Sequence, residues 1–234
     1  MSSHYAQYCP VARALELVGE RWTLLVAREL LLGPRRFTDL LAGLPGISAN
    51  VLTGRLKELE QAGLVAKRTL PPPAASTVYE LTEAAAGLAA VLAAMAQWGR
   101  HMLGRPRPDD EVHSAWLVLG LAVTATAPQL PDDTSYELRI DGTADETFHI
   151  RSHGGHLQPG HGPATNPNAV IHMDSATLAA LTSGDLDRNA SESERPIAID
   201  GDRDSGQRLI EALAASSSPP SPETSASHDD HATV

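Results

Sequence analysis

Four short amphipathic helices followed by two short strands form the pattern that most restricts how this chain of 234 residues can fold. Pro10 suits the first position of a helix, Gly33-Pro34 stops the second helix, and Ser48 can cap the fourth, which ends at Gly63. The run "PPPAAS" then separates two strand-like segments. The predicted elements, in chain order, are helices over 10–18, 21–33, 35–44 and 48–63 and strands over 64–70 and 77–82.

This order of elements is that of the winged helix-turn-helix, in which one helix enters the major groove of DNA. In the fourth helix Leu52, Leu56 and Leu59 mark one face, which leaves a polar face opposite. A solvated surface helix shows the same division, so both interpretations fit this helix taken alone. The polar side chains suit base reading, because Asn can pair with adenine, Thr can touch the thymine methyl group, and Lys and Arg can meet guanine or phosphate. The residues predicted to contact double-stranded DNA, including two basic pairs that would clamp phosphates, are Arg35, Arg36, Ser48, Asn50, Val51, Thr53, Gly54, Arg55, Lys57, Lys67 and Arg68.

The charge of the chain is divided unevenly along its length. The net charge of −11 by itself argues against a nucleic-acid partner. Residues 1–104, however, carry ten Lys and Arg against eight Asp and Glu, a net charge of +2, so residues 105–234 carry −13. This asymmetry predicts two modules with different partners, and it assigns any phosphate-binding face to the first.

Composition places the domain boundaries. We expect a first domain over 1–104, closed by a long alanine-rich helix over 83–102, and a proline-containing linker over 105–112. A second domain over 113–215 mixes helices with strands, and a tail over 216–234 has too little apolar content to fold. The predicted fold class is therefore α+β. In the second domain we expect helices over 110–127, from 174 and over 203–214, and strands at "SYELRI", "ETFHIR", "AVIHM" and "PIAID".

The first domain resembles the HxlR-type winged helix-turn-helix regulators of bacteria. The segments "GERWTLLVARELL", "GISANVLTGRLKELEQAGLV" and "YELTE" carry the resemblance, which covers about residues 9–102. It implies a transcription regulator, such as a repressor, that binds DNA as a homodimer built from the first and last helices, here about 11–18 and 83–102. The wing departs from the family pattern, because "PPPAASTVY" lacks the basic residue that often follows two prolines.

Cys9, the single cysteine, precedes the first helix. Some proteins of the HxlR type use a cysteine at this place to sense oxidants or electrophiles, and a helix N-terminus favours the thiolate form of a cysteine. A small buried residue at a dimer interface is the structural alternative. With no second cysteine in the chain, redox sensing would need an intersubunit disulfide or a small-molecule adduct.

The second domain resembles the sterol-carrier-protein-like fold, an α/β module with an apolar tunnel. The segments "LTSGDLD" and "IAIDGD" carry this resemblance over about residues 113–214, and "ASESERP" departs from it. It implies a small apolar ligand, although plain core packing is the alternative for every lining residue. The predicted ligand-binding residues are Trp116, Leu119, Phe148 and Ile150.

The remaining patterns argue against other classes of function. Four histidines, His149, His153, His156 and His161, lie close together, but their irregular spacing among glycines favours a flexible hairpin over a metal site. We expect no bound metal, no cofactor and no enzyme, since no catalytic motif is present. The absence of a long apolar run and of a secretory signal predicts a cytoplasmic protein without a membrane partner.

The sequence thus predicts a cytoplasmic, dimeric, DNA-binding transcription regulator. Its second domain would bind a small apolar ligand or contact a partner, and either could be coupled to DNA affinity. Two alternatives stay open. One is a thiol-based redox regulator that acts through Cys9. The other is a lipid-carrier or interaction protein that has lost DNA binding.

Overall fold

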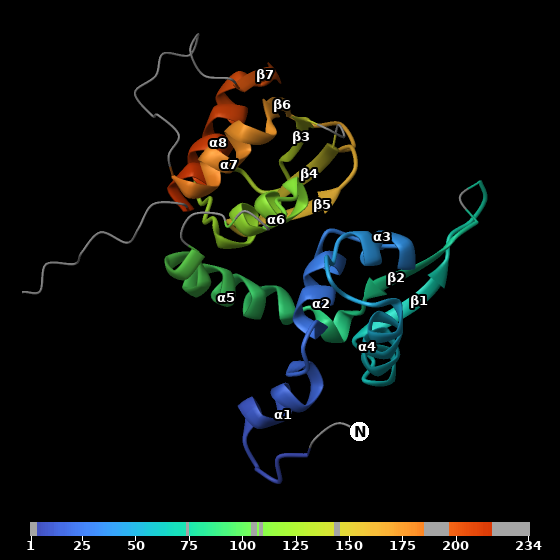
Figure 1. The fold of residues 1–234 in the computed structure, drawn as a ribbon. Helices are drawn as coiled ribbons and strands as arrows, with labels where there is room; N and C mark the ends of the chain where they lie inside the picture. The colour runs from blue at the N-terminus through green and yellow to red at the C-terminus, as the bar shows by residue number, and fades with distance from the viewer. Residues whose placement is uncertain are drawn as a thin grey trace, which may run out of the picture.

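The computed structural model describes residues 4–73, 75–103, 107, 110–142, 146–184 and 197–216 (Figure 1). Its buried apolar side chains form two clusters. We call the part of the chain that ends at residue 103 the first module, and the part that begins at residue 110 the second module. Among the residues described, no helix is both long and apolar enough to cross a membrane.

The first module is a winged helix-turn-helix. Its helices are α1 (Pro10–Val18), α2 (Thr23–Leu31), α3 (Phe37–Ala42) and α4 (Ala49–Gln61). The antiparallel strands β1 (Val65–Thr69) and β2 (Thr77–Leu81) form the wing, and a short 3-10 turn (Glu83–Ala85) leads into α5 (Leu88–Leu103). Each element predicted for this module is present, although the long closing helix is interrupted after its first turn.

Two short backbone signals set the ends of α4. Ser48 caps its start, where the side-chain oxygen accepts a hydrogen bond from the Val51 N–H at 3.3 Å. Gly63 has φ +71°, a left-handed conformation that glycine adopts without steric cost, and this turns the chain from α4 into β1. The predicted cap and end of the fourth helix are therefore confirmed.

The second module packs three helices on one mixed sheet. The helices are α6 (Ser114–Thr124), α7 (Ser175–Ser183) and α8 (Arg203–Ser216), and the strands are β3 (Ser135–Asp141), β4 (Glu146–His153), β5 (His156–His161), β6 (Ala169–Asp174) and β7 (Ile197–Gly201). The strand order is β5-β4-β3-β6-β7, in which only β3 and β6 run parallel to each other. Tyr136, Leu138 and Ile140 of β3 are buried, as its alternating apolar pattern predicts, and Glu137 between them is buried as well.

The histidine-rich stretch forms the predicted hairpin, because the antiparallel strands β4 and β5 are joined at Gly154-Gly155. The strand β5 itself was not predicted, and it pairs with β4 along its whole length. Leu157 and Gly160 are buried on this strand, so it is an integral part of the sheet. Residue 216 belongs to α8, and the rest of the predicted tail lies outside the described residues, as do half of the predicted linker and the "ASESERP" segment.

The two modules share buried surface. Leu32, which follows α2, is 3% exposed and belongs to the core cluster of the second module. Its carbonyl oxygen accepts a hydrogen bond from the backbone N–H of His161 at 2.8 Å. A mixed helix-and-sheet fold with an N-terminal helix-turn-helix is thus confirmed, whereas the sterol-carrier identity of the second module stays a prediction.

Candidate nucleic-acid interface

Three leucines seat the helix α4 in the first module. Leu52, Leu56 and Leu59 are 0%, 2% and 1% exposed and pack in the first module's core. Burying three leucine side chains stabilises the position of the helix by several kcal/mol, at about 1.5–3 kcal/mol for each. The opposite face of α4 is therefore held in a fixed orientation toward solvent.

That opposite face carries most of the predicted base-reading residues. Asn50, Val51, Thr53 and Lys57 are exposed on α4, and Ser48 lies exposed at its cap. The Thr53 hydroxyl donates to the Ala49 carbonyl oxygen at 2.8 Å, which leaves its methyl group as the outward apolar contact. A side chain at the half-buried Gly54 would meet open space, so the helix can approach a neighbouring surface closely there.

Arg55 differs from the other predicted contacts on α4. Its side chain is 19% exposed, and its Nη1 atom lies 2.7 Å from Glu58 and 3.7 Å from Glu20. These carboxylates draw the guanidinium along the helix and toward the segment that follows α1. In this conformation Arg55 stabilises the placement of α4, and its role as a DNA contact stays a prediction.

The wing carries the second basic pair. Lys67 is exposed, with Nζ 5.8 Å from the centre of the Tyr79 ring on the neighbouring strand. Arg68 donates two hydrogen bonds to Glu80, at 3.0 and 2.8 Å, and these lower the pKa of Glu80 and raise that of Arg68. Of this basic pair, Arg68 is held by a carboxylate, whereas Lys67 forms no ion pair with any of the described residues. Arg36 is exposed at the start of α3.

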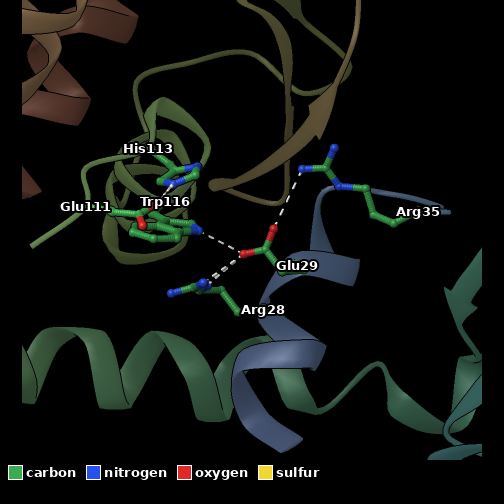
Figure 2. Close-up of polar contacts among 6 residues, drawn as sticks. All are labelled: Arg28, Glu29, Arg35, Glu111, His113 and Trp116. Atoms are coloured by element: carbon green, nitrogen blue, oxygen red, sulfur yellow. Dashed lines mark hydrogen bonds and ion pairs between the residues drawn. The ribbon is translucent and has the colours of Figure 1, made fainter. Parts of the chain in front are cut away.

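Arg35 is turned away from this surface and toward the second module (Figure 2). Its side chain is 17% exposed, and its Nη2 atom lies 3.8 Å from Glu29. Its Nε atom is buried without a hydrogen-bond partner among the described residues. The backbone of Arg35 exchanges two hydrogen bonds with that of Tyr79, at 2.9 and 2.8 Å, which extends the wing by one more pairing. The structure therefore does not bring Arg35 together with the other predicted DNA contacts.

Glu29 is a functional candidate that the sequence did not single out. It lies in α2 with only 2% of its side chain exposed. Its Oε1 atom accepts hydrogen bonds from Arg28, at 3.1 and 2.8 Å, and from the Trp116 indole N–H at 2.9 Å (Figure 2). The single acidic residue within an apolar helical run was a signal for it, but its partner Trp116 lies 87 residues away.

The predicted ligand-binding residues of the second module occupy two different places. Leu119, Phe148 and Ile150 are buried within its core cluster. Trp116 instead lies at the junction between the modules, where it lines a pocket of about 320 Å³. The other residues that line this pocket are Trp22, Leu25, Arg28, Leu44, Pro45, Asp110 and Glu111.

Cys9 and the histidines complete the predicted sites. Cys9 is exposed and precedes α1 as its cap residue, without a side-chain hydrogen bond to the helix. His161 packs edge-on against Phe148 at 5.3 Å, and partial burial of its ring, with the nearby positive charge of Arg35, lowers the pKa of His161. Among the described residues, no three His, Cys, Asp or Glu side chains are grouped to hold a metal ion.

Comparison with known proteins identifies the family. The sequence model of the HxlR-like helix-turn-helix family matches residues 17–106. YodB, an HTH-type transcriptional regulator of Bacillus subtilis, is 40% identical over 91 residues, which are 38% of this chain and 81% of YodB. The chain belongs to the HxlR-like helix-turn-helix family. The resemblance expected for the first domain is confirmed.

The similar proteins are named as transcriptional regulators, which points away from an enzyme. An HTH-type transcriptional regulator of Mycobacterium tuberculosis is 43% identical over 104 residues, which are 44% of this chain. This chain spans 65% of the length of that relative. Structures of YodB in its reduced form and bound to quinone cover 43% and 40% of this chain and 100% and 99% of their own, at 35% and 36% identity. Their TM-scores are 0.37 and 0.35, which are too low to add anything about the fold.

Proposed function

We propose that this protein is a dimeric transcription regulator that reads DNA with the exposed face of α4. The observation that carries the proposal is the division of α4, which buries three leucines and presents Asn50, Val51, Thr53 and Lys57 to solvent. An α-helix fits the major groove of B-DNA, and the residues near the start of such a helix reach the base edges. Membership of the HxlR-like family supports the same function.

Lys67 and Arg36 would contact phosphates on either side of α4. Both side chains are exposed, and among the described residues no carboxylate forms an ion pair with the Lys67 ammonium or the Arg36 guanidinium group. Arg68 would join them only by releasing Glu80, so we expect its contribution to be smaller. Phosphate contacts of this kind fix the register of a protein on DNA, whereas base contacts give it sequence preference.

Exposed apolar side chains on two helices support a homodimer. On α5, Val91, Met95, Trp98 and Met102 recur at helical spacing and are 45%, 46%, 66% and 63% exposed. On α1, which projects from the body of the first module in Figure 1, Val11 is 66% exposed. If a second copy of the chain covers these faces, the dimer has two α4 helices. Each could then contact one of two DNA half-sites whose centres are about 34–36 Å apart.

The test is a salt titration of DNA binding by the full-length chain. A duplex would first be selected from a random-sequence pool, and its binding would be compared with that of a shuffled duplex by fluorescence anisotropy. We expect preference for the selected duplex and an affinity that falls steeply with salt, because phosphate contacts release counterions. Equal affinity for both duplexes, or no dependence on salt, would contradict the proposal.

A thiol switch is the second candidate function, and the exposure of Cys9 at the start of α1 favours it. The relative YodB has been solved in a quinone-bound form, which makes a quinone a suitable probe for this chain. Cys9→Ser separates the candidates. If quinone or oxidant still weakens DNA binding in this variant, the switch is not at Cys9.

The small apolar ligand of the second module also stays a proposal. Because Leu119, Phe148 and Ile150 are core residues, a ligand that reached all three would have to displace core packing. Native mass spectrometry of the purified protein tests for a co-purified apolar molecule and reports the dimer mass at the same time. A lipid-carrier protein without DNA binding would retain the ligand and fail the salt titration.

A further inference from the structure

We propose that Trp116 of the second module, acting through Glu29, positions the DNA-reading module and makes the second module a required part of the DNA-binding unit. This inference rests on the proposed function. It concerns a pair of positioning residues, neither of which would touch DNA. The connection begins at a carboxylate that is buried in the first module and completed by a side chain from the second.

The buried carboxylate of Glu29 depends on its hydrogen-bond and ion-pair partners for stability. A carboxylate that is 2% exposed has lost its hydration, and burying it costs free energy unless hydrogen bonds replace the water. Arg28 supplies the neighbouring charge, and burial in turn lowers the pKa of Arg28. The indole N–H of Trp116 is the hydrogen-bond donor to Glu29 that comes from the second module.

Trp116 is itself held on both faces of its ring. The guanidinium of Arg28 lies 4.5 Å from the ring centre, and the imidazole of His113 stacks at 4.1 Å with an interplanar angle of 25°. A ring fixed in this way presents its N–H to Glu29 in one direction (Figure 2). The contact therefore joins a side chain packed by two neighbours to a buried carboxylate.

From Glu29 the connection continues to the wing and to α3. The second carboxylate oxygen, Oε2, lies 3.8 Å from Arg35, whose backbone pairs with Tyr79 in β2. A methyl group on Gly43, at the end of α3, would come within 2.5 Å of the same oxygen, so Glu29 also packs against the segment that leads into α4. Displacing Glu29 would thus affect both elements that flank the proposed DNA surface.

A second contact attaches the same, C-terminal end of α2 to the second module. Leu32 is buried in the core of the second module, and its carbonyl oxygen accepts the His161 N–H at 2.8 Å. The helix α2 is consequently anchored to the second module at Glu29 and just beyond its last turn. A change that weakens the packing of the second module should therefore also change the position of α2 in the first module.

Trp116→Phe tests the proposal in the full-length protein. It removes the indole N–H and keeps an aromatic ring for Arg28 and His113. We expect affinity for the selected duplex to fall about tenfold, equivalent to about 1.4 kcal/mol, with the DNA-facing side chains unchanged. Tyr136→Phe is the matched control, because it removes the buried hydrogen bond to Ser205 at 2.8 Å inside the second module. The control should bind DNA within twofold of the parent protein.

Two outcomes would overturn the proposal while the parent protein binds DNA normally. One is DNA binding by Trp116→Phe that is as tight as that of the parent. The other is an equal loss of affinity in Tyr136→Phe, which would indicate general destabilisation. Glu29→Leu completes a double-mutant cycle, because it removes the carboxylate oxygen that accepts the Trp116 indole N–H. The effects of Trp116→Phe and Glu29→Leu on DNA affinity should be less than additive, since both remove one contact.

Hydrogen exchange distinguishes failure of this inference from failure of the proposed function. If the parent protein binds no DNA, the proposed function fails. The connection between the modules can still be tested by the hydrogen-exchange rates of the backbone amides in β1 and β2. Trp116→Phe should speed exchange in the wing severalfold, and Tyr136→Phe should not. Unchanged wing exchange in Trp116→Phe would overturn the connection, whatever the DNA result.

Discussion

Truncation to alanine should lower the free energy of unfolding at Leu52 of α4 but leave it almost unchanged at the adjacent Val51. Leu52 is 0% exposed in the first module's core, and its neighbour Val51 is 40% exposed. Leu52→Ala removes buried carbon atoms and leaves a cavity, so the free energy of unfolding should fall by about 3 kcal/mol. Val51→Ala removes exposed atoms and introduces a better helix former, so the change should stay within about 0.5 kcal/mol.

Urea unfolding followed by far-ultraviolet circular dichroism measures both variants. Leu52→Ala should lower the midpoint without changing the slope, which would indicate lost stability and not a changed unfolded state. Val51→Ala should keep the midpoint and weaken binding to the selected duplex. Equal destabilisation by both variants would refute the orientation of α4, and with it the surface proposed to meet DNA.

Three further predictions test separate parts of the account. Ser48→Ala should cost about 1 kcal/mol in the free energy of unfolding, measured by urea titration, because α4 loses its cap. In anisotropy titrations, Asn50→Ala should reduce the free energy of binding by about 1–3 kcal/mol for the selected duplex alone. Lys67→Ala should weaken binding to all duplexes alike and reduce by about 1 the slope of log affinity against log salt concentration. Because the pKa of His161 is lowered in the folded protein, its neutral form contributes stability that is lost as pH falls through the ordinary histidine value of about 6.5. His161→Gln should therefore lose less stability than the parent between pH 7.5 and 5.5, and an identical pH profile would contradict this.

The first module was predictable because its signals are local. The leucine spacing of α4, the cap at Ser48 and the turn at Gly63 all act within a few residues, and the structure contains each of them. The strand β5 was missed because glycine, proline and histidine rarely mark a strand. What makes "HLQPGH" a strand is its pairing with β4, which is a tertiary effect.

The arginines show where sequence reasoning about the site ends. Arg35, Arg55 and Arg68 carry the same positive charge as Lys57 and Lys67, and nothing in the local sequence pattern separates the two groups. Their carboxylate partners do: Glu29 for Arg35, Glu58 for Arg55 and Glu80 for Arg68. Only folding brings Arg68 to Glu80 or Trp116 to Glu29, so the free cations could not be distinguished from the paired ones beforehand.

Chemical modification of the two lysines tests the central claim most directly. Lys57 on α4 and Lys67 on β1 are the only lysines in the chain, and both lie exposed on the proposed DNA surface. Acetylation of each would be followed by mass spectrometry with and without a saturating amount of the selected duplex. We predict that DNA slows acetylation of both lysines severalfold and that high salt restores it. Unchanged acetylation of Lys57 in the DNA-bound protein would contradict the claim that α4 faces DNA.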